Sequence, residues 1–257
     1  MAYVRPPAQQ VDLRSRRESS TGWAGIFMMA GIASLLFSPA LTAGNKDFSV
    51  ALRGSLTTGS QLFPNPNSSS AVQRAAFFSL KRIWGYGAEV RYRFPETNLS
   101  LGISADYLRI TEPQRPISGP NGLQASVEDG YRVIPLELTG YFVIPISGET
   151  IGVYIGGGAG TYFGRRIYRI AGTEAPTIDA GNGFGIHVLS GISWRFNEIF
   201  SINAEMKFRD LQFNSTNQFS SSPILSGAFP VQVQTQPFES RVHTDGMIFQ
   251  LGAVFDF

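Results

Sequence analysis

The sequence predicts an all-β fold: a closed, antiparallel, up-and-down transmembrane β-barrel of about eight strands. Three observations predict this fold. Apolar and polar residues alternate along eight segments, tight turns alternate with long connections between the segments, and aromatic residues gather near segment ends. The alternation is incompatible with helices, and the other two observations favour a membrane barrel over a soluble β-sandwich.

The alternation has a period of two in every segment. Along 199–209, for example, Phe200 and Ile202 fall on one face, whereas Asn203 and Glu205 fall on the other. Successive side chains of a strand point to opposite faces, so each segment has one apolar and one polar side. Each is long enough for a tilted strand to cross a bilayer, which takes ~9–11 residues. The segments are 48–57, 82–94, 99–109, 131–144, 151–163, 183–196, 199–209 and 247–257.

The connections between the segments alternate in length. Residues 94–98, 145–149 and 196–198 form tight turns. The remaining connections are long and rich in Ser, Pro, Asn and Gly; they cover approximately 60–80, 111–129, 165–180 and 212–243. Short periplasmic turns and long extracellular loops are typical of outer-membrane barrels, so the long connections are expected on the cell surface.

Aromatic residues form two predicted bands. Near the short turns they are Tyr92, Phe94, Phe142, Trp194, Phe196, Phe200, Phe255 and Phe257. Near the opposite rim they are Trp84, Tyr107, Phe163, Phe184 and Phe208. Two aromatic girdles around an aliphatic belt suit the two interfaces of a membrane. The alternative is a soluble sandwich in which the same residues pack inward at the ends of a core.

The polar faces carry charges of both signs in the middle of the segments. Eight strands enclose an interior about wide enough for side chains to fill, and buried charges must pair. We therefore expect a polar network in the lumen, which argues against a wide open pore. Its candidate members are Arg53, Glu89, Arg91, Asp106, Glu137, Arg195, Glu205, Lys207 and Arg209.

The first 43 residues read as a leader. Arg14, Arg16 and Arg17 precede an uncharged run, 22–37, and small residues follow up to Ala43. This pattern is typical of a secretory signal peptide, so we expect cleavage near Ala43 and a barrel domain over 44–257. Without the leader the chain has 17 basic and 17 acidic residues, and no basic face for nucleic acid is expected.

Little in the sequence indicates catalysis. Cysteine is absent, which excludes a disulfide framework and thiolate chemistry. The only histidines are His187 and His243, without metal-ligand spacing. Ser190 lies three residues from His187, so the two would point to opposite faces of a strand. The glycine run 156–160 lacks a phosphate-loop motif and is expected to leave room in the lumen. We expect no catalytic residue, metal or cofactor.

Three segments resemble a known family. The last, 245–257, ends in Phe257 and looks like the terminal strand of outer-membrane barrel proteins. Residues 132–142 and 154–162 are similar to strands of small porin-family barrels. The chain thus resembles the OmpA/OmpX/OmpW-like superfamily of eight-stranded barrels. The resemblance implies location in the bacterial outer membrane, contact with its lipid and lipopolysaccharide, and recognition of Phe257 by the barrel assembly machinery.

The expected function is that of a non-enzymatic integral barrel with a structural, surface or narrow porin-like role. A second hypothesis is ligand binding or adhesion through the connections 60–80, 165–180 and 212–243. In the last connection the candidates for contact with a hydrophobic ligand or lipopolysaccharide are Phe219, Ile224, Leu225, Phe229 and Phe238. A lipid A-modifying enzyme and a secreted soluble barrel are further alternatives.

Overall fold

The computed structural model divides the chain into two units, Met1–Gly44 and Asn45–Phe257. It describes residues 47–118, 124–145, 150–227 and 229–257, so the expected leader and its cleavage site lie outside the described residues. Over the described ranges, no helix is long and apolar enough to cross a membrane.

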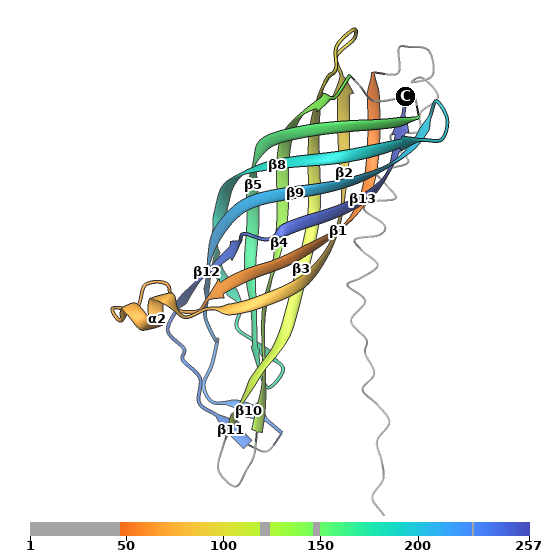
Figure 1. The fold of residues 1–257 in the computed structure, drawn as a ribbon. Coiled ribbons are helices and arrows are strands. Elements are labelled where there is room, and N and C mark those ends of the chain that lie inside the picture. Colours follow the sequence, from red (N-terminus) through yellow and green to blue (C-terminus); the bar gives the residue numbers. More distant parts are fainter. Residues whose placement is uncertain (1–46, 119–123, 146–149, 228) are drawn as a thin grey trace, which may run out of the picture. The chain divides into compact units, whose positions relative to one another are not determined.

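Eight long antiparallel strands form a closed ring (Figure 1). Each strand pairs with the next, and β1 pairs with β2 on one side and with β13 on the other, which closes the ring. The predicted antiparallel barrel of eight strands is confirmed. Its strands are β1 (Phe48–Phe63), β2 (Phe78–Arg93), β3 (Leu99–Ser118), β4 (Gln124–Val143), β5 (Ile151–Ile170), β8 (Asn182–Arg195), β9 (Phe200–Asn217) and β13 (Met247–Asp256).

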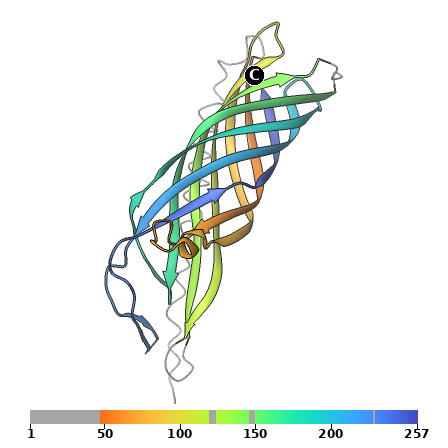
Figure 2. The same ribbon diagram turned by 60° about the vertical axis from the view of Figure 1, so that its left-hand side comes forward.

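The shorter elements belong to the connections at one end of the ring. They are α2 (Ala71–Ala75), β6 (Thr173–Glu174), β7 (Thr177–Ala180), β10 (Ile224–Ser226), β11 (Phe229–Val231) and β12 (Phe238–Thr244). Of these, β12 directly precedes β13 in the sequence and pairs with the same two strands, β1 and β9. In both ribbon views the C-terminus and the tight turns lie at one end, with α2 and β10–β11 toward the other (Figures 1 and 2).

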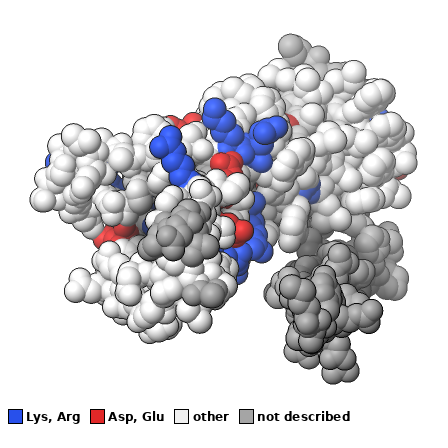
Figure 3. Space-filling view, turned by 90° about the horizontal axis from the view of Figure 1, so that it is seen from below, with Lys and Arg blue, Asp and Glu red and all other residues white. Residues whose placement is uncertain are grey.

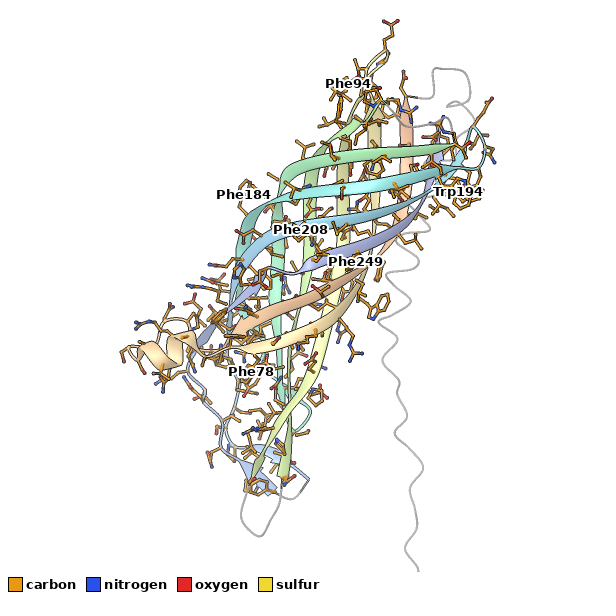
Figure 4. All side chains as sticks on the ribbon, viewed as in Figure 1. Phe78, Phe94, Phe184, Trp194, Phe208 and Phe249 are labelled. Atoms are coloured by element: carbon orange, nitrogen blue, oxygen red, sulfur yellow. The ribbon has the colours of Figure 1, made fainter. Side chains whose placement is uncertain are left out.

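The polarity of the barrel wall is inverted relative to a soluble protein. On β9 the Lys207 side chain is fully buried, whereas its neighbour Phe208 is 46% exposed. Figure 4 shows such aromatic residues projecting from the outside of the wall, with Phe94 and Trp194 toward the tight turns. An apolar outer face around a charged interior is the arrangement of a membrane-spanning barrel, because hydrocarbon replaces water outside it.

The apolar outer belt covers only part of the long strands. On β9 the outward residues are apolar from Phe200 to Phe208, and then become polar at Asp210, Gln212 and Asn214. A nine-residue span fits the apolar band of an outer-membrane barrel, which is about 25 Å tall. The rest of β9, and the corresponding parts of β3, β4 and β5, therefore form an extension beyond the belt.

This extension corrects the predicted connections. Three of the predicted connections contain strand where loop was expected. The strand residues are most of 111–129, residues 165–170 of the next connection and residues 212–217 of the last one. The physical reason is a change of polarity: within the belt the apolar side chains point outward, as at Phe208, but beyond it they point inward, as at Leu211 and Phe213. Apolar and polar residues of β9 therefore still alternate beyond the belt, but the apolar residues move from even to odd positions.

Candidate functional site

The lumen of the belt holds a network of ion pairs, and Glu89 on β2 is one of its centres. Arg53 Nη1 donates to Glu89 Oε2 over 2.7 Å, and Arg91 Nε donates to Oε1 over 2.9 Å. The Tyr141 hydroxyl donates to the same carboxylate over 2.8 Å. The Arg91 guanidinium also lies 3.6 Å from the centre of the Tyr141 ring. Two cations and a phenol thus satisfy this buried carboxylate.

Asp106 on β3 links the two sides of the network. It accepts hydrogen bonds from Arg53 Nε at 3.0 Å and from Arg209 Nη2 at 3.5 Å. Arg209 in turn places its Nε 2.7 Å from Glu137 Oε1, although that N–H is not aligned as a hydrogen bond. This chain of contacts joins β1, β3, β9 and β4 across the lumen.

Glu137 on β4 is the second centre. Lys207 Nζ donates to Glu137 Oε2 over 2.9 Å, and the Tyr162 hydroxyl donates to Oε1 over 2.9 Å. His187 lies beside it, with Nδ1 3.9 Å from Oε1 and Nε2 2.9 Å from the Thr139 hydroxyl. His187 is therefore a buried wall residue within the polar network.

Glu205 on β9 completes the set of carboxylates. It accepts hydrogen bonds from the Tyr154 hydroxyl at 2.8 Å and from Asn203 Nδ2 at 3.0 Å, and Arg91 Nη2 lies 3.5 Å away. The network then contains four carboxylates and four cations, so its formal charge is zero. Such neutrality is what burial of this many charges requires.

The structure brings eight of the nine sequence-predicted residues into this network. Arg195 is the exception, and its assignment is wrong: it is exposed at the end of β8, where it lines the opening beside the tight turns. Residues missed by the sequence reasoning are Tyr141, Tyr154, Tyr162 and Asn203, which share the polar face of their strands with the predicted charges. Strand parity places Tyr141 and Asn203 on the polar face, but only charged side chains were selected as candidates for the network.

An apolar plug lies on the extension side of the network. Its members come from six strands of the ring and from β12, and they include Tyr131, whose ring lies 5.9 Å from that of Phe213. Tyr162 belongs to both layers, because its ring is in the plug and its hydroxyl holds Glu137. The plug consists of Leu62, Leu80, Ile83, Leu108, Tyr131, Val133, Tyr162, Leu211, Phe213 and Val242.

A small cavity opens on the other side, at the end with the tight turns. It measures about 250 Å³, and Arg93, Arg195 and Asp256 are among its lining residues. Arg91 and Tyr154 also line it, and both belong to the ion-pair network. The cavity therefore ends at the ion-pair network. It is a blind vestibule, separated from the extension by the network and the apolar plug.

The last connection packs on the extension. Phe219 and Ile224 are only 3% and 5% exposed, in a cluster with Val127, Ile170 and other residues of β4 and β5. Phe229 and Phe238 pack against the same cluster. Among the five proposed contact residues only Leu225, which is 65% exposed, presents a large apolar surface. The expectation that all five offer a hydrophobic binding surface is wrong.

His243 occupies a strand, β12, on the outside of the barrel. Its Nε2 lies 3.1 Å from Asp210 Oδ1 on β9, and Asp245 accepts a hydrogen bond from Gln61. In the sequence, the acidic residue nearest to His243 is Asp245, two positions away. Because β12 continues the register of β13 along β9, the histidine faces Asp210 instead.

Within the described ranges, no group of three or more His, Asp and Glu residues could hold a metal ion. The His187 side chain points into the lumen and is buried, whereas Ser190 lies on the outer face of β8. These two residues therefore form no nucleophile–base pair, as the strand period predicted.

No family model and no curated protein matches this chain. Several solved structures do. Neisserial surface protein A matches with 11% identity and a TM-score of 0.43, covering 82% of this chain and 97% of its own. Ail, the attachment invasion locus protein of Yersinia pestis, matches with 12% identity and a TM-score of 0.39 over 82% and 99% of the two chains. The Escherichia coli outer membrane protease OmpT matches with 8% identity and a TM-score of 0.42 over 82% and 95%.

Proposed function

We propose that this protein is a non-conducting, non-enzymatic barrel of the bacterial outer membrane that presents its extension at the cell surface. One observation carries this proposal: two packed layers, the neutral ion-pair network and the apolar plug, fill the lumen. A solute that crossed the barrel would have to displace both layers. A narrow porin-like role is therefore less well supported, because it requires an open path through the lumen.

The apolar belt and the length of the strands support placement in an outer membrane. A barrel in the cytoplasmic membrane is not the expected architecture for a chain whose sequence predicts a secretory leader. In the proposed orientation the tight turns face the periplasm, and the extension faces outward. Phe257, whose backbone N–H donates to Phe48 O over 2.8 Å, would be recognised by the barrel assembly machinery before the ring closes.

A conductance measurement tests the central claim. The refolded protein, inserted into planar lipid bilayers in 1 M salt, is expected to give no discrete current steps, whereas a general porin measured in the same bilayers conducts. Because an unfolded sample would also give no current steps, the same sample is run unboiled on a gel to confirm that the barrel is folded. Stable steps whose size changes in a Lys207→Ala variant would show a path through the lumen and overturn the proposal.

Adhesion or ligand binding through the extension is the second candidate. It is favoured by the order of this region: Arg166 Nε donates to Asp129 Oδ1 over 2.8 Å, and Asn217 Nδ2 donates to Ala175 O over 2.9 Å. These bonds and the cluster around Phe219 make the extension a fixed platform instead of a set of separate loops. A rigid surface loses little conformational entropy on binding a partner.

A further inference from the structure

Three arginines lie side by side on the outside of the barrel. Arg109 on β3 is the cross-strand partner of Arg132 on β4, and Arg132 is the partner of Arg165 on β5. All three side chains are exposed. Directly opposed residues on adjacent strands are ~4.5–5.5 Å apart, and like charges at this spacing destabilise a sheet. A bound anion would relieve the repulsion between these three arginines.

The row marks the edge of the apolar belt. Ile134 and Phe163 are cross-strand partners two positions nearer the tight turns than Arg132 and Arg165. Both side chains are more than 40% exposed on the outside of the barrel. Tyr107 stands at the same level on β3, with its ring 5.5 Å from that of Tyr86. The arginines thus begin where the lipid-facing residues end, at the depth of the headgroups.

The protein does not supply the anion. Among the described residues, none of the three arginines has an ion pair. The next residues along the extension, Thr111, Gly130 and Ile167, are uncharged. The following level is different: Arg169 lies 2.6 Å from Glu174 and 3.6 Å from Glu128, and the hydrogen bond to Glu174 raises the pKa of its guanidinium. Arg169 of the extension therefore has carboxylate partners, whereas Arg109, Arg132 and Arg165 have none among the described residues.

The row is also confined to one side of the barrel. On the opposite side the first polar residues beyond the belt are Asp210 on β9, and His243 and Asp245 near the start of β13. Seen from the extension end, Lys and Arg gather mainly in the middle of the view, with Asp and Glu among them, and large parts of the surface on either side carry no charge (Figure 3). An uneven distribution of this kind fits one localised ligand better than a uniform ring of lipid.

We propose that Arg109, Arg132 and Arg165 bind the phosphate groups of lipid A, the phosphorylated sugar headgroup of lipopolysaccharide. Guanidinium groups bind phosphate oxygens in pairs of parallel hydrogen bonds, and three adjacent ones match a headgroup with more than one phosphate. The acyl chains then lie along the outward apolar residues of β3, β4 and β5. This inference rests on the proposed outer-membrane orientation.

Binding of diphosphoryl lipid A to the refolded protein in detergent micelles tests the site. Native mass spectrometry over a range of lipid A concentrations gives the bound fraction for the wild type, for the variant R109Q/R132Q/R165Q and for the control R74Q/R93Q/R195Q. The control removes the same charge from three exposed arginines away from the row. We expect the row variant to weaken binding at least about tenfold and the control to bind as the wild type does.

Three outcomes would overturn the site. Equal binding by the wild type and the row variant, equal weakening in both triple variants, or equally tight binding of singly charged phosphatidylglycerol would each exclude selective recognition of lipid A by this row. Unboiled gels verify that each variant is folded. A Ser221→Cys variant, in a chain with no native cysteine, reports the orientation separately. Failure to label it on intact cells would refute the proposed orientation, whereas labelling together with unchanged lipid A binding by the row variant would refute the site alone.

Discussion

At the scale of single residues, the lumen depends on balanced charge. Glu137 is buried between Lys207 and Arg209, so a Glu137→Leu substitution leaves two cations without this partner. Removal of one member of a buried ion pair costs about 3–5 kcal/mol. We expect a loss of that size in the free energy of unfolding, measured by urea titration of the protein in lipid vesicles with gel mobility as the readout of folding.

The double variant E137L/K207M provides the matched control. It removes one charge of each sign, and Arg209 keeps its contact with Asp106 at 3.5 Å. A pair replaced by apolar residues of similar volume often costs little, so the double variant is expected to recover most of the lost stability. A double variant less stable than Glu137→Leu would show that charge balance is not what the network provides.

Much of this network could be predicted from the sequence, because strand parity alone places Arg53, Glu89 and Glu137 on polar faces. Parity could not exclude Arg195, which has the right face but lies too close to the end of its strand to be covered. The partner of each charge was also beyond prediction. Arg53 contacts Asp106, which is two strands away, and that contact depends on barrel curvature and side-chain length.

At the scale of the strand, glycine makes room for the large polar side chains. A Cβ atom on Gly191 of β8 would lie 2.6 Å from the hydroxyl of Tyr154, which donates to Glu205. We expect Gly191→Ala to displace that ring and to lower the free energy of unfolding by about 1–3 kcal/mol, the usual cost of overpacking. The same urea titration measures it.

Gly54→Ala on β1 is the matched control for this prediction. Gly54 lies on the outer face, where a Cβ atom would meet nothing within 4 Å. Its replacement is expected to leave stability unchanged or slightly higher, since alanine restricts the unfolded chain. Equal losses in the two variants would mean that the strands need glycine for their backbone conformation instead of for space in the lumen.

The ends of the strands were less predictable than their centres. Within the belt the bilayer sets the length and the polarity, so the segments were recognised. Beyond it the strands enter water, and β9 exchanges its apolar face between Phe208 and Leu211. A single alternating pattern cannot follow that exchange, and the Ser- and Asn-rich composition favoured loops. The packing of Phe219 on β4 and β5 depends on contacts far apart in the sequence.

At the scale of the whole barrel, stability should depend on closure of the ring more than on the extension. β13 pairs with β1 from Ser49 to Thr57 and with β9 from Phe200 to Phe208, so it completes the hydrogen bonds of two strands at once. Deletion of 247–257 would leave both strands with unpaired N–H and C=O groups in lipid, where each costs several kcal/mol. We expect this variant to show no compact, SDS-resistant band in unboiled samples.

Deletion of 219–236, with a short Gly-Ser linker in its place, is the contrasting change. It removes β10, β11 and the side chains of Phe219 and Ile224 from the cluster on the extension, but leaves every pairing of the eight-stranded ring intact. The variant is therefore expected to keep the heat-modifiable band, because the hydrogen bonds that face the lipid are those of the ring. If the loop deletion abolished the band while the strand deletion retained it, the extension and not the closed ring would hold the barrel together.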